Sequence, residues 1–250
     1  MPELDGRNAV VTGAGRGLGQ GIAKCLATHG AQVAVLDLDP AAAEATAELI
    51  RGRSGRAWSS GMDVTDEVAV RRTLESARER LGVLDLVVNC AGILTVGHVV
   101  ELEPADWRRV LEVNATGVFL VSQAAVRLMI RDRREGSIIS VASIAGKIGE
   151  PGLSHYAASK FAVVGFTQAL AREVAEHGIT VNAVCPGVVV TPMIEELSAR
   201  WGASLQELVG RQAIHRPQTP DEVAAAVMFL HANRSITGQA LNVDGGTVFS

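Results

Sequence analysis

The regular alternation of short β-branched runs with longer segments of helical spacing constrains the fold of this chain most. Six runs predict strands: Ala9 to Thr12, Gln32 to Leu38, Leu84 to Asn89, Gly136 to Val141, Thr180 to Val184 and Ala240 to Val243. The run from Arg56 to Asp63 is a weaker, seventh match. Between the runs, apolar residues recur three and four apart in Gly17 to His29, Ala41 to Ile50, Val68 to Leu81 and Asp221 to His231, a spacing that predicts helices.

This alternation determines the expected fold class. Parallel neighbouring strands need a crossover connection, so strands that alternate with helices predict a parallel sheet covered by helices on both faces. The expected fold is therefore α/β, a doubly wound, Rossmann-like parallel sheet. No linker or repeat interrupts the series, and residues 1–250 are expected to form one domain.

One segment departs from the regular spacing. From Thr191 to Pro217, apolar residues stand at helical spacing among charged ones. This pattern is typical of a helix that packs into a core, and it fits a substrate lid at residues 191–217 equally well. The sequence leaves both interpretations open.

Composition excludes several partners. The formal net charge is −4 and no Lys/Arg cluster is present, so the basic face that binds nucleic acid is missing. Cys25, Cys90 and Cys185 form no C-x-x-C pair, and the six histidines form no ligand cluster, so no metal site is expected. The first residues carry no signal pattern and no run reaches ~18 apolar residues, which predicts a cytoplasmic protein that does not enter the membrane.

The segment after the first predicted strand contains Gly13, Gly15, Gly17 and Gly19 and leads into a helix. It departs from the strict G-x-G-x-x-G spacing, since Leu18 stands where the third glycine counted from Gly13 belongs. Glycines let the backbone turn and approach a pyrophosphate, whose charge then faces the free N–H groups at the helix start. The second strand ends near Asp37, 37 − 19 = 18 residues past Gly19. An acid at this spacing accepts hydrogen bonds from the adenosine ribose, which predicts a dinucleotide site.

Tyr156 and Lys160 stand four residues apart, on one face of a predicted helix. Hydride transfer to a carbonyl needs a proton donor, and the reverse reaction needs a base. Lowering a tyrosine pKa from about 10 to about 7 takes roughly 4 kcal/mol. One ammonium at about 4 Å supplies ~4 kcal/mol at an effective dielectric constant of ~20, before desolvation. Ser143, at the end of a predicted strand, offers a hydroxyl that could orient the substrate oxygen.

The two motifs together, Gly13-x-x-x-Gly17-x-Gly19 and Tyr156-x-x-x-Lys160, resemble the short-chain dehydrogenase/reductase family over essentially the whole chain. Further signatures of the family follow in order: Asp63, Asn89-Cys90-Ala91-Gly92, Asn114, Ser143 and Pro186-Gly187. Cys90 departs from the pattern, because the family usually has a second Asn there. Since the flanking residues are intact, we expect only a local change.

The resemblance implies an oxidoreductase that uses a nicotinamide cofactor. It assigns the chemistry to Asn114, Ser143, Tyr156 and Lys160, with Asn114 holding a water that connects Lys160 to solvent. It assigns Asp63 to the adenine and places Val188 and Thr191 near the nicotinamide carboxamide. The cofactor-binding set that it implies is Gly13, Arg16, Gly17, Leu18, Gly19, Asp37, Asp63, Val64, Asn89, Ala91, Gly92, Tyr156, Lys160, Pro186, Gly187, Val189 and Thr191.

NAD is the expected cofactor, because the Asp37 carboxylate would repel the 2'-phosphate of NADP. Arg16 argues in the opposite direction. The stretches at 149–156 and 186–193 resemble polyol dehydrogenases of the sorbitol and galactitol type, and Glu150 and His155 could present polar groups to such a substrate. The expected reaction is hydride transfer between NAD and a secondary alcohol or ketone, such as a polyol or diol. The alternatives are an NADPH-linked 3-oxoacyl-thioester reductase and a catalytically silent nucleotide-binding sensor.

A homotetramer is expected from the resemblance and from two apolar helical segments, Glu103 to Ile130 and Tyr156 to His177. The alternative is that both segments simply pack on the sheet.

Overall fold

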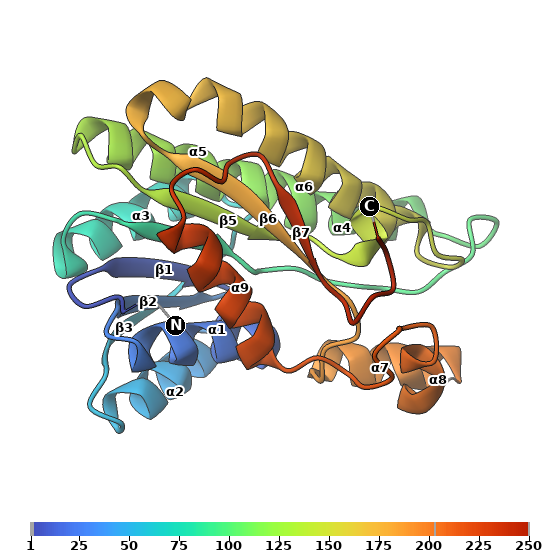
Figure 1. The fold of residues 1–250 in the computed structure, drawn as a ribbon. Helices are drawn as coiled ribbons and strands as arrows, with labels where there is room; N and C mark the ends of the chain where they lie inside the picture. The colour runs from blue at the N-terminus through green and yellow to red at the C-terminus, as the bar shows by residue number, and fades with distance from the viewer. Residues whose placement is uncertain (1–2, 203, 250) are drawn as a thin grey trace.

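A seven-stranded sheet runs through the centre of the molecule (Figure 1). The computed structural model describes residues 3–202 and 204–249. The strands lie in the order β3-β2-β1-β4-β5-β6-β7 and all neighbouring pairs are parallel. Their bounds are β1 Asn8–Thr12, β2 Gln32–Asp37, β3 Arg56–Gly61, β4 Leu86–Asn89, β5 Ser137–Val141, β6 Thr180–Pro186 and β7 Ala240–Val243. The doubly wound fold is confirmed, and the weak match at Arg56 is a strand at the sheet edge.

Helices cover both faces of the sheet. The set α1 Gly17–Thr28, α2 Pro40–Arg51 and α9 Pro220–Ala232 lies on one face, and α3 Glu67–Leu81, α5 Gly117–Arg131 and α6 Ser154–Glu173 lie on the other. Side chains alternate between the two faces of a strand, so Val11 packs with the first set while its neighbour Val10 packs with the second. Both residues are completely buried. This is why the strands read as continuous apolar runs.

The strand order reverses between β1 and β4, and the chain continues from these two strands, through two loops, to helices on opposite faces of the sheet. In open α/β sheets, ligands bind in the crevice at such a switch point, beyond the carboxyl ends of the strands. The hydroxyl of Thr12 joins the two loops, because it accepts hydrogen bonds from the backbone N–H groups of Cys90 and Ala91 at 3.1 and 3.2 Å. The fold therefore brings the glycine-rich loop and the 90–92 segment together.

The helix expected from Glu103 to Ile130 is present and contains one π-helical turn. It consists of α4 Pro104–Leu111, a π-helical turn η1 Glu112–Thr116 that contains Asn114, and α5. The turn coincides with side-chain bonds from Asn114 to the backbone of a distant loop, described below. The predicted helical segment is therefore present from Pro104 to Arg131, with a π-helical turn that a local periodicity does not signal. The helix expected from Tyr156 to His177 ends at Glu173, before a short 3-10 turn, η3 Ala175–His177.

One helical stretch, Pro104–Arg131, is long and apolar enough to cross a bilayer by length and composition alone, with a mean hydropathy of 1.4. A core helix of a soluble protein passes the same test. Half of the apolar window is buried inside the fold, where Val121, Ala125 and Met129 pack against the sheet.

The 191–217 segment forms α7 Pro192–Trp201 and α8 Leu205–Val209, which stand apart from the sheet (Figure 1). Leu197 is buried, whereas Leu205 is 38% exposed. Leu197, Ile194 and Trp201 pack on a cluster that contains Tyr156 and no sheet residue. The segment therefore covers the predicted reacting centre.

Candidate active site

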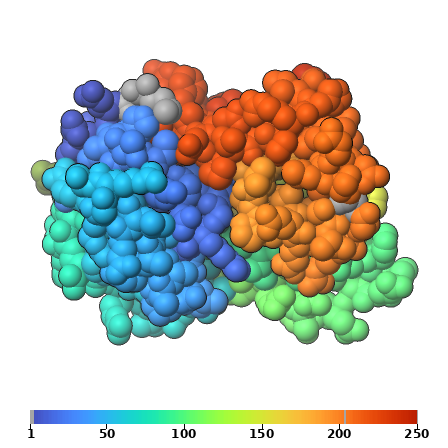
Figure 2. Space-filling model, turned by 90° about the horizontal axis from the view of Figure 1, so that it is seen from below, coloured from blue at the N-terminus to red at the C-terminus, as the bar shows by residue number. Residues whose placement is uncertain are grey.

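The predicted site residues meet at the carboxyl ends of β1, β4, β5 and β6. A Cβ atom on Gly17 would lie 3.5 Å from Pro192 Cδ and 3.7 Å from Thr191 Cβ, so the start of α1 and the start of α7 are neighbours. Figure 2 shows the same relation on the surface, where the orange 192–209 segment lies beside the blue N-terminal third of the chain.

The glycine-rich loop forms a cradle that has no room for a side chain at Gly13 or Gly19. Gly13 has a left-handed φ of 62°, and a Cβ there would lie 2.6 Å from Ala91 Cα. A Cβ on Gly19 would collide with the backbone oxygen of Gly13. Arg16 precedes α1 without a side-chain cap bond, so the N–H groups of the first turn are available to an anion. This cradle fits the pyrophosphate of a dinucleotide.

Asp37 ends β2 beside this cradle. Its Oδ2 accepts a hydrogen bond from the Gly15 N–H at 2.8 Å, and its Oδ1 accepts one from the Asp39 N–H at 3.1 Å. A carboxylate offers about four acceptor positions, so Asp37 retains capacity for ribose hydroxyls. Arg16 is exposed.

Tyr156 and Lys160 are both buried on one face of α6, with exposed fractions of 8% and 5%. Lys160 Nζ lies 5.6 Å from the Tyr156 ring centroid and donates a hydrogen bond to the Val141 carbonyl at 2.8 Å. Burial raises the pKa of Tyr156 to about 12, although a hydrogen bond with the Ser143 side chain acts in the opposite direction. Burial lowers the pKa of Lys160 to about 8. In the free protein the phenol is therefore held in its protonated form.

Asn114 is completely buried in the π-helical turn. Its Nδ2 donates to the Ile93 carbonyl at 2.9 Å and to Ser159 Oγ at 3.1 Å, and its Oδ1 accepts from the Ile93 N–H at 2.8 Å. A Cβ on Gly92 would lie 3.3 Å from Asn114 Oδ1 and 3.7 Å from Lys160 Nζ. The turn thus brings the predicted relay amide close to the predicted relay ammonium, and it holds the 93 loop against α6.

Two further predicted residues lie at the ends of β3 and β4. Asn89 Nδ2 donates to Ser122 Oγ at 2.9 Å and to Ser140 Oγ at 3.1 Å, which ties β4 to α5 and β5. Asp63 accepts the backbone N–H of Thr65 at 2.9 Å. Val64 follows it and is mostly buried.

The residues after β6 connect the site to the lid segment. The Gly187 N–H donates to the Val243 carbonyl at 3.1 Å. Val189 forms an isolated parallel bridge with Gln218, and the Thr191 hydroxyl donates to the Val189 carbonyl at 3.2 Å. The structure therefore places Pro186, Gly187, Val189 and Thr191 between the sheet and α7.

Glu150 and His155 do not present polar groups to the solvent side of the site as the sequence suggested, because one is ion-paired and the other is buried. His155 is completely buried, its Nε2 lies 2.6 Å from Thr95 Oγ1, and burial lowers its pKa. The Glu150 carboxylate forms an ion pair with Arg211 at 3.0 Å. Sequence reasoning missed Thr95 and Arg211, because each contact joins residues about sixty positions apart and no local pattern signals it.

Cys90, where the sequence departs from the family pattern, takes part in the contact between the two loops through its backbone. Its backbone N–H still binds Thr12, and burial raises the pKa of the thiol to about 12. Among the described residues, no group of three His, Cys, Asp or Glu side chains lies close enough together to hold a metal ion.

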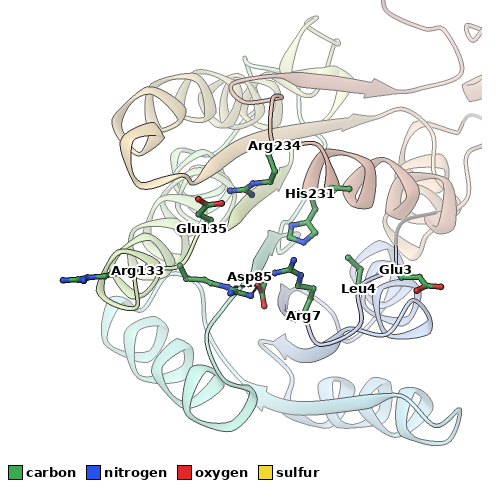
Figure 3. Close-up of a pocket in the computed structure, with 10 residues that line it drawn as sticks. Glu3, Leu4, Arg7, Asp85, Arg133, Glu135, His231 and Arg234 are labelled. Atoms are coloured by element: carbon green, nitrogen blue, oxygen red, sulfur yellow. Dashed lines mark hydrogen bonds and ion pairs between the residues drawn. The ribbon is translucent and has the colours of Figure 1, made fainter.

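A hollow of about 600 Å³ lies at the amino ends of the strands, on the side opposite to the candidate site (Figure 3). Asp85 is completely buried there and forms ion pairs with Arg7 at 3.0 Å and with Arg134. His231 Nδ1 lies 3.0 Å from Ser137 Oγ, and burial lowers the pKa of His231 to about 4. The buried carboxylate in this hollow is already paired, and the hollow is far from the switch point.

Comparison with known proteins agrees with this geometry. A family model described as short chain dehydrogenase matches residues 7–201. An L-2,3-butanediol dehydrogenase of Corynebacterium glutamicum is 40% identical over 97% of this chain and 98% of its own length. A (3R)-3-hydroxyacyl-CoA dehydrogenase of Canis lupus familiaris is 40% identical over 95% of each chain. A short-chain type dehydrogenase/reductase from Mycobacterium marinum superposes with a TM-score of 0.90 at 34% identity, over 99% of this chain and 97% of that one.

The sheet, the cradle and these similarities define an oxidoreductase that binds a nicotinamide cofactor and acts on CH–OH groups. The chain belongs to the short-chain dehydrogenase/reductase family.

Proposed function

We propose that the protein is an NAD(H)-dependent dehydrogenase that moves hydride between nicotinamide and a small secondary alcohol or ketone, with Tyr156 as the acid–base group. The observation that carries this proposal is the burial of Tyr156 and Lys160 side by side, with Ser143 on the phenol and Asn114 beside the ammonium. This family's enzymatic role argues against the silent-sensor alternative.

Tyr156 would hold or release the proton of the reacting oxygen, and Ser143 would orient that oxygen. Bringing the phenol pKa from about 12 to about 7 requires roughly 7 kcal/mol. The Lys160 ammonium lies 5.6 Å from the centre of the Tyr156 ring, and a unit charge at such a separation supplies about 3 kcal/mol at an effective dielectric constant of ~20. Lys160 is thus not sufficient alone. When bound, the oxidised nicotinamide accepts the hydride and adds a second positive charge.

Asp37 supports the choice of NAD. Its fixed carboxylate would repel a 2'-phosphate and would lose its ribose hydrogen bonds. We expect kcat/KM with NAD+ to exceed that with NADP+, and Asp37→Ala to narrow the ratio by about tenfold or more, the range for hydrogen bonds to a charged group.

Asp39→Ala is the matched control. Asp39 caps α2 by accepting the N–H groups of Ala41 and Ala42, so its loss costs about 1 kcal/mol of stability and leaves the cofactor ratio unchanged. A wild-type preference for NADP+ would refute the assignment of the cofactor and would favour Arg16 as the determinant.

For the substrate, we propose a small hydroxylated compound, a polyol or a vicinal diol. The 40% identity to a butanediol dehydrogenase supports it. The similarity to a 3-hydroxyacyl-CoA dehydrogenase favours a second candidate, an NADPH-linked 3-oxoacyl-thioester reductase. A spectrophotometric screen of polyols, diols and 3-oxoacyl thioesters with both cofactors distinguishes the two, because faster turnover of the thioesters with NADPH would replace the first proposal.

We also propose that residues 191–217 act as a substrate lid. The two ends of the segment are joined to each other, since the Val190 N–H donates to the Gln218 carbonyl at 3.2 Å and the Gln218 N–H donates to the Val188 carbonyl at 2.8 Å. Arg211 contacts the 150 loop across the site through Glu150. Opening would break this ion pair, whose Arg211 side is exposed, and would separate Leu197 and Trp201 from the Tyr156 cluster.

A homotetramer in the cytoplasm is the proposed state. The helices α4, α5 and α6 carry exposed apolar side chains on the faces turned away from the sheet: Trp107, Phe119, Ile130 and Phe161. Phe119 and Phe166 stack edge to face at 6.1 Å. The two segments expected to associate, Glu103 to Ile130 and Tyr156 to His177, therefore pack on the sheet and also expose apolar side chains to solvent. Light scattering that finds only the 26.2 kDa species would refute the assembly.

A further inference from the structure

We infer that the substrate carries an apolar group, such as a methyl or short alkyl group, on the carbon next to the reacting carbinol. This inference rests on the proposed function and narrows it from polyols to alkyl-flanked alcohols and diols.

The wall around the reacting centre is apolar. The cluster that contains Tyr156 takes most of its side chains from the loop after β4, the loop before α6 and the lid helix α7, and it also includes Val110, Ala145 and Ala157. Its side chains include Ile93, Val96, Leu153, Ile194, Leu197 and Trp201. A ligand bound between these segments and the Tyr156 hydroxyl would contact these apolar side chains.

The three segments meet closely. The Gly97 N–H donates to the Gly152 carbonyl at 2.9 Å, which joins the two loops. A Cβ on Gly152 would lie 3.5 Å from Val96 Cγ1 and 3.7 Å from Trp201 Nε1. The indole of Trp201 therefore extends from the end of α7 to the junction of the loops, and the lid closes this side of the site.

The polar side chains of this region already have partners. Thr95 contacts His155, the Glu150 carboxylate binds Arg211, and Asn114 is occupied by Ile93 and Ser159. An additional substrate hydroxyl could bond to these groups only by sharing them with, or displacing, their present partners.

Two buried atoms of the first turn of α6, Ser154 Oγ and His155 Nδ1, have no hydrogen-bond partner. Neither atom has solvent-accessible surface, so a substrate hydroxyl would have to displace the wall to reach it. Each hydroxyl beyond the reacting carbinol and its orienting contacts would therefore lose its water without a protein side chain to replace it, which is unfavourable.

The sharpest test compares butane-2,3-diol with butane-1,2,3,4-tetrol, in matched stereochemistry. The two share a four-carbon skeleton and differ only in two terminal hydroxyls. If each unsatisfied hydroxyl costs about tenfold, or ~1.4 kcal/mol, kcat/KM with NAD+ should be about a hundredfold higher for the diol. Equal or faster turnover of the tetrol would overturn the inference.

A variant pair locates the effect in the wall. Val96→Thr keeps the side-chain shape and adds one hydroxyl within the cluster, so the diol-to-tetrol ratio should fall by about tenfold. Val99→Thr makes the same change three residues away, where the side chain is 71% exposed, and should leave the ratio unchanged. An unchanged ratio in Val96→Thr with a normal fold would contradict the assignment of Val96 to the substrate wall.

A binding measurement separates this inference from the proposed function. The chain has three tryptophans, so in the Trp58→Phe/Trp107→Phe variant all indole fluorescence comes from Trp201. With NAD+ present, the diol should change this emission at concentrations where the tetrol has no effect. An equal response to both ligands would overturn the inference whatever the kinetics. A diol-specific response without NAD-linked turnover would refute the proposed function and retain the apolar wall.

Discussion

The edge formed by the carboxyl ends of the strands (the carboxyl edge) and the edge formed by their amino ends (the amino edge) differ in the partners of their buried polar groups. At the carboxyl edge, Lys160 is buried with a backbone carbonyl as its hydrogen-bond acceptor, and the N–H groups at the start of α1 have no side-chain cap. At the amino edge, the buried Asp85 is paired with two arginines, and His231 is bonded to a serine (Figure 3).

This difference suggests that the carboxyl edge serves catalysis and the amino edge serves the stability of the fold. Leaving a buried ionisable group without an opposite charge costs stability and shifts its pKa, as the lowered pKa of Lys160 and the raised pKa of Tyr156 show. Such groups gain most from a ligand that brings charge. Asp85 at the amino edge already has two opposite charges beside it, so a charged ligand would add little there. We therefore expect substitutions at the carboxyl edge to alter turnover, and those at the amino edge to alter folding.

Tyr156→Phe gives the largest expected effect. It removes the hydroxyl at the reacting oxygen and no group of the glycine cradle, so kcat should fall by roughly 10²–10⁴-fold while the Kd of NADH stays within a few-fold. Stopped-flow hydride transfer and NADH fluorescence titration measure the two quantities. Retention of more than about a tenth of the wild-type kcat, when chemistry limits turnover, would disprove the assignment of Tyr156.

The wild-type protein allows a direct companion measurement, because Tyr156 is its single tyrosine. Phenolate absorbance in the near ultraviolet then reports this residue alone. In the free enzyme it should titrate near the raised pKa of about 12, and addition of NAD+ should lower that value. If NAD+ leaves the titration unmoved, the bound cofactor does not supply the missing stabilisation of the phenolate.

Asp85→Ala tests the opposite edge. It removes a buried acceptor of bonds from Arg7, Arg134 and the Asn8 N–H. The free energy of unfolding should fall by about 3 kcal/mol, the lower end for a broken buried pair, because both arginines reach solvent. Urea denaturation measures the loss, and kcat per folded molecule should be unchanged.

Glu67→Ala is the control for that loss. It breaks the exposed ion pair with Arg71 at 3.4 Å and should cost less than about 0.5 kcal/mol. A fall in kcat of Asp85→Ala per folded molecule would show that the two edges are coupled.

His231 should make the amino edge sensitive to acid. Its pKa in the folded protein is about 4, below the ordinary 6.5, because burial disfavours the charged imidazole. Between these values the unfolded chain binds more protons, so this contribution to stability is fully present above pH 6.5 and is lost as the pH falls towards 4. The shift corresponds to at most about 3 kcal/mol, and partial exposure reduces our expectation to about 2 kcal/mol.

The measurement is urea denaturation of wild type and His231→Gln at several pH values. The variant should lose less stability than wild type between pH 6.5 and 4, since glutamine does not titrate. Parallel curves for the two proteins would show that His231 is not held neutral by the fold.

The sequence by itself determined the class of fold, the glycine cradle and the Tyr156 and Lys160 pair. These features are local: strand and helix periodicities extend over fewer than twenty residues, and a spacing of four places two side chains on one helix face. The position of Asp37 at the end of the second strand could also be predicted, because all strands of a parallel sheet end at the same edge.

Only the tertiary structure decided what each polar side chain meets. Asn114 binds Ile93 from a π-helical turn, and the buried His155 contacts Thr95. Likewise, α7 packs on Tyr156, although its apolar spacing would suit the sheet equally well. These contacts join segments that are distant in sequence, and their free energy depends on burial and on the partner found. The sequence shows which side chains are polar, whereas the folded structure determines which of them can still form a hydrogen bond with a substrate.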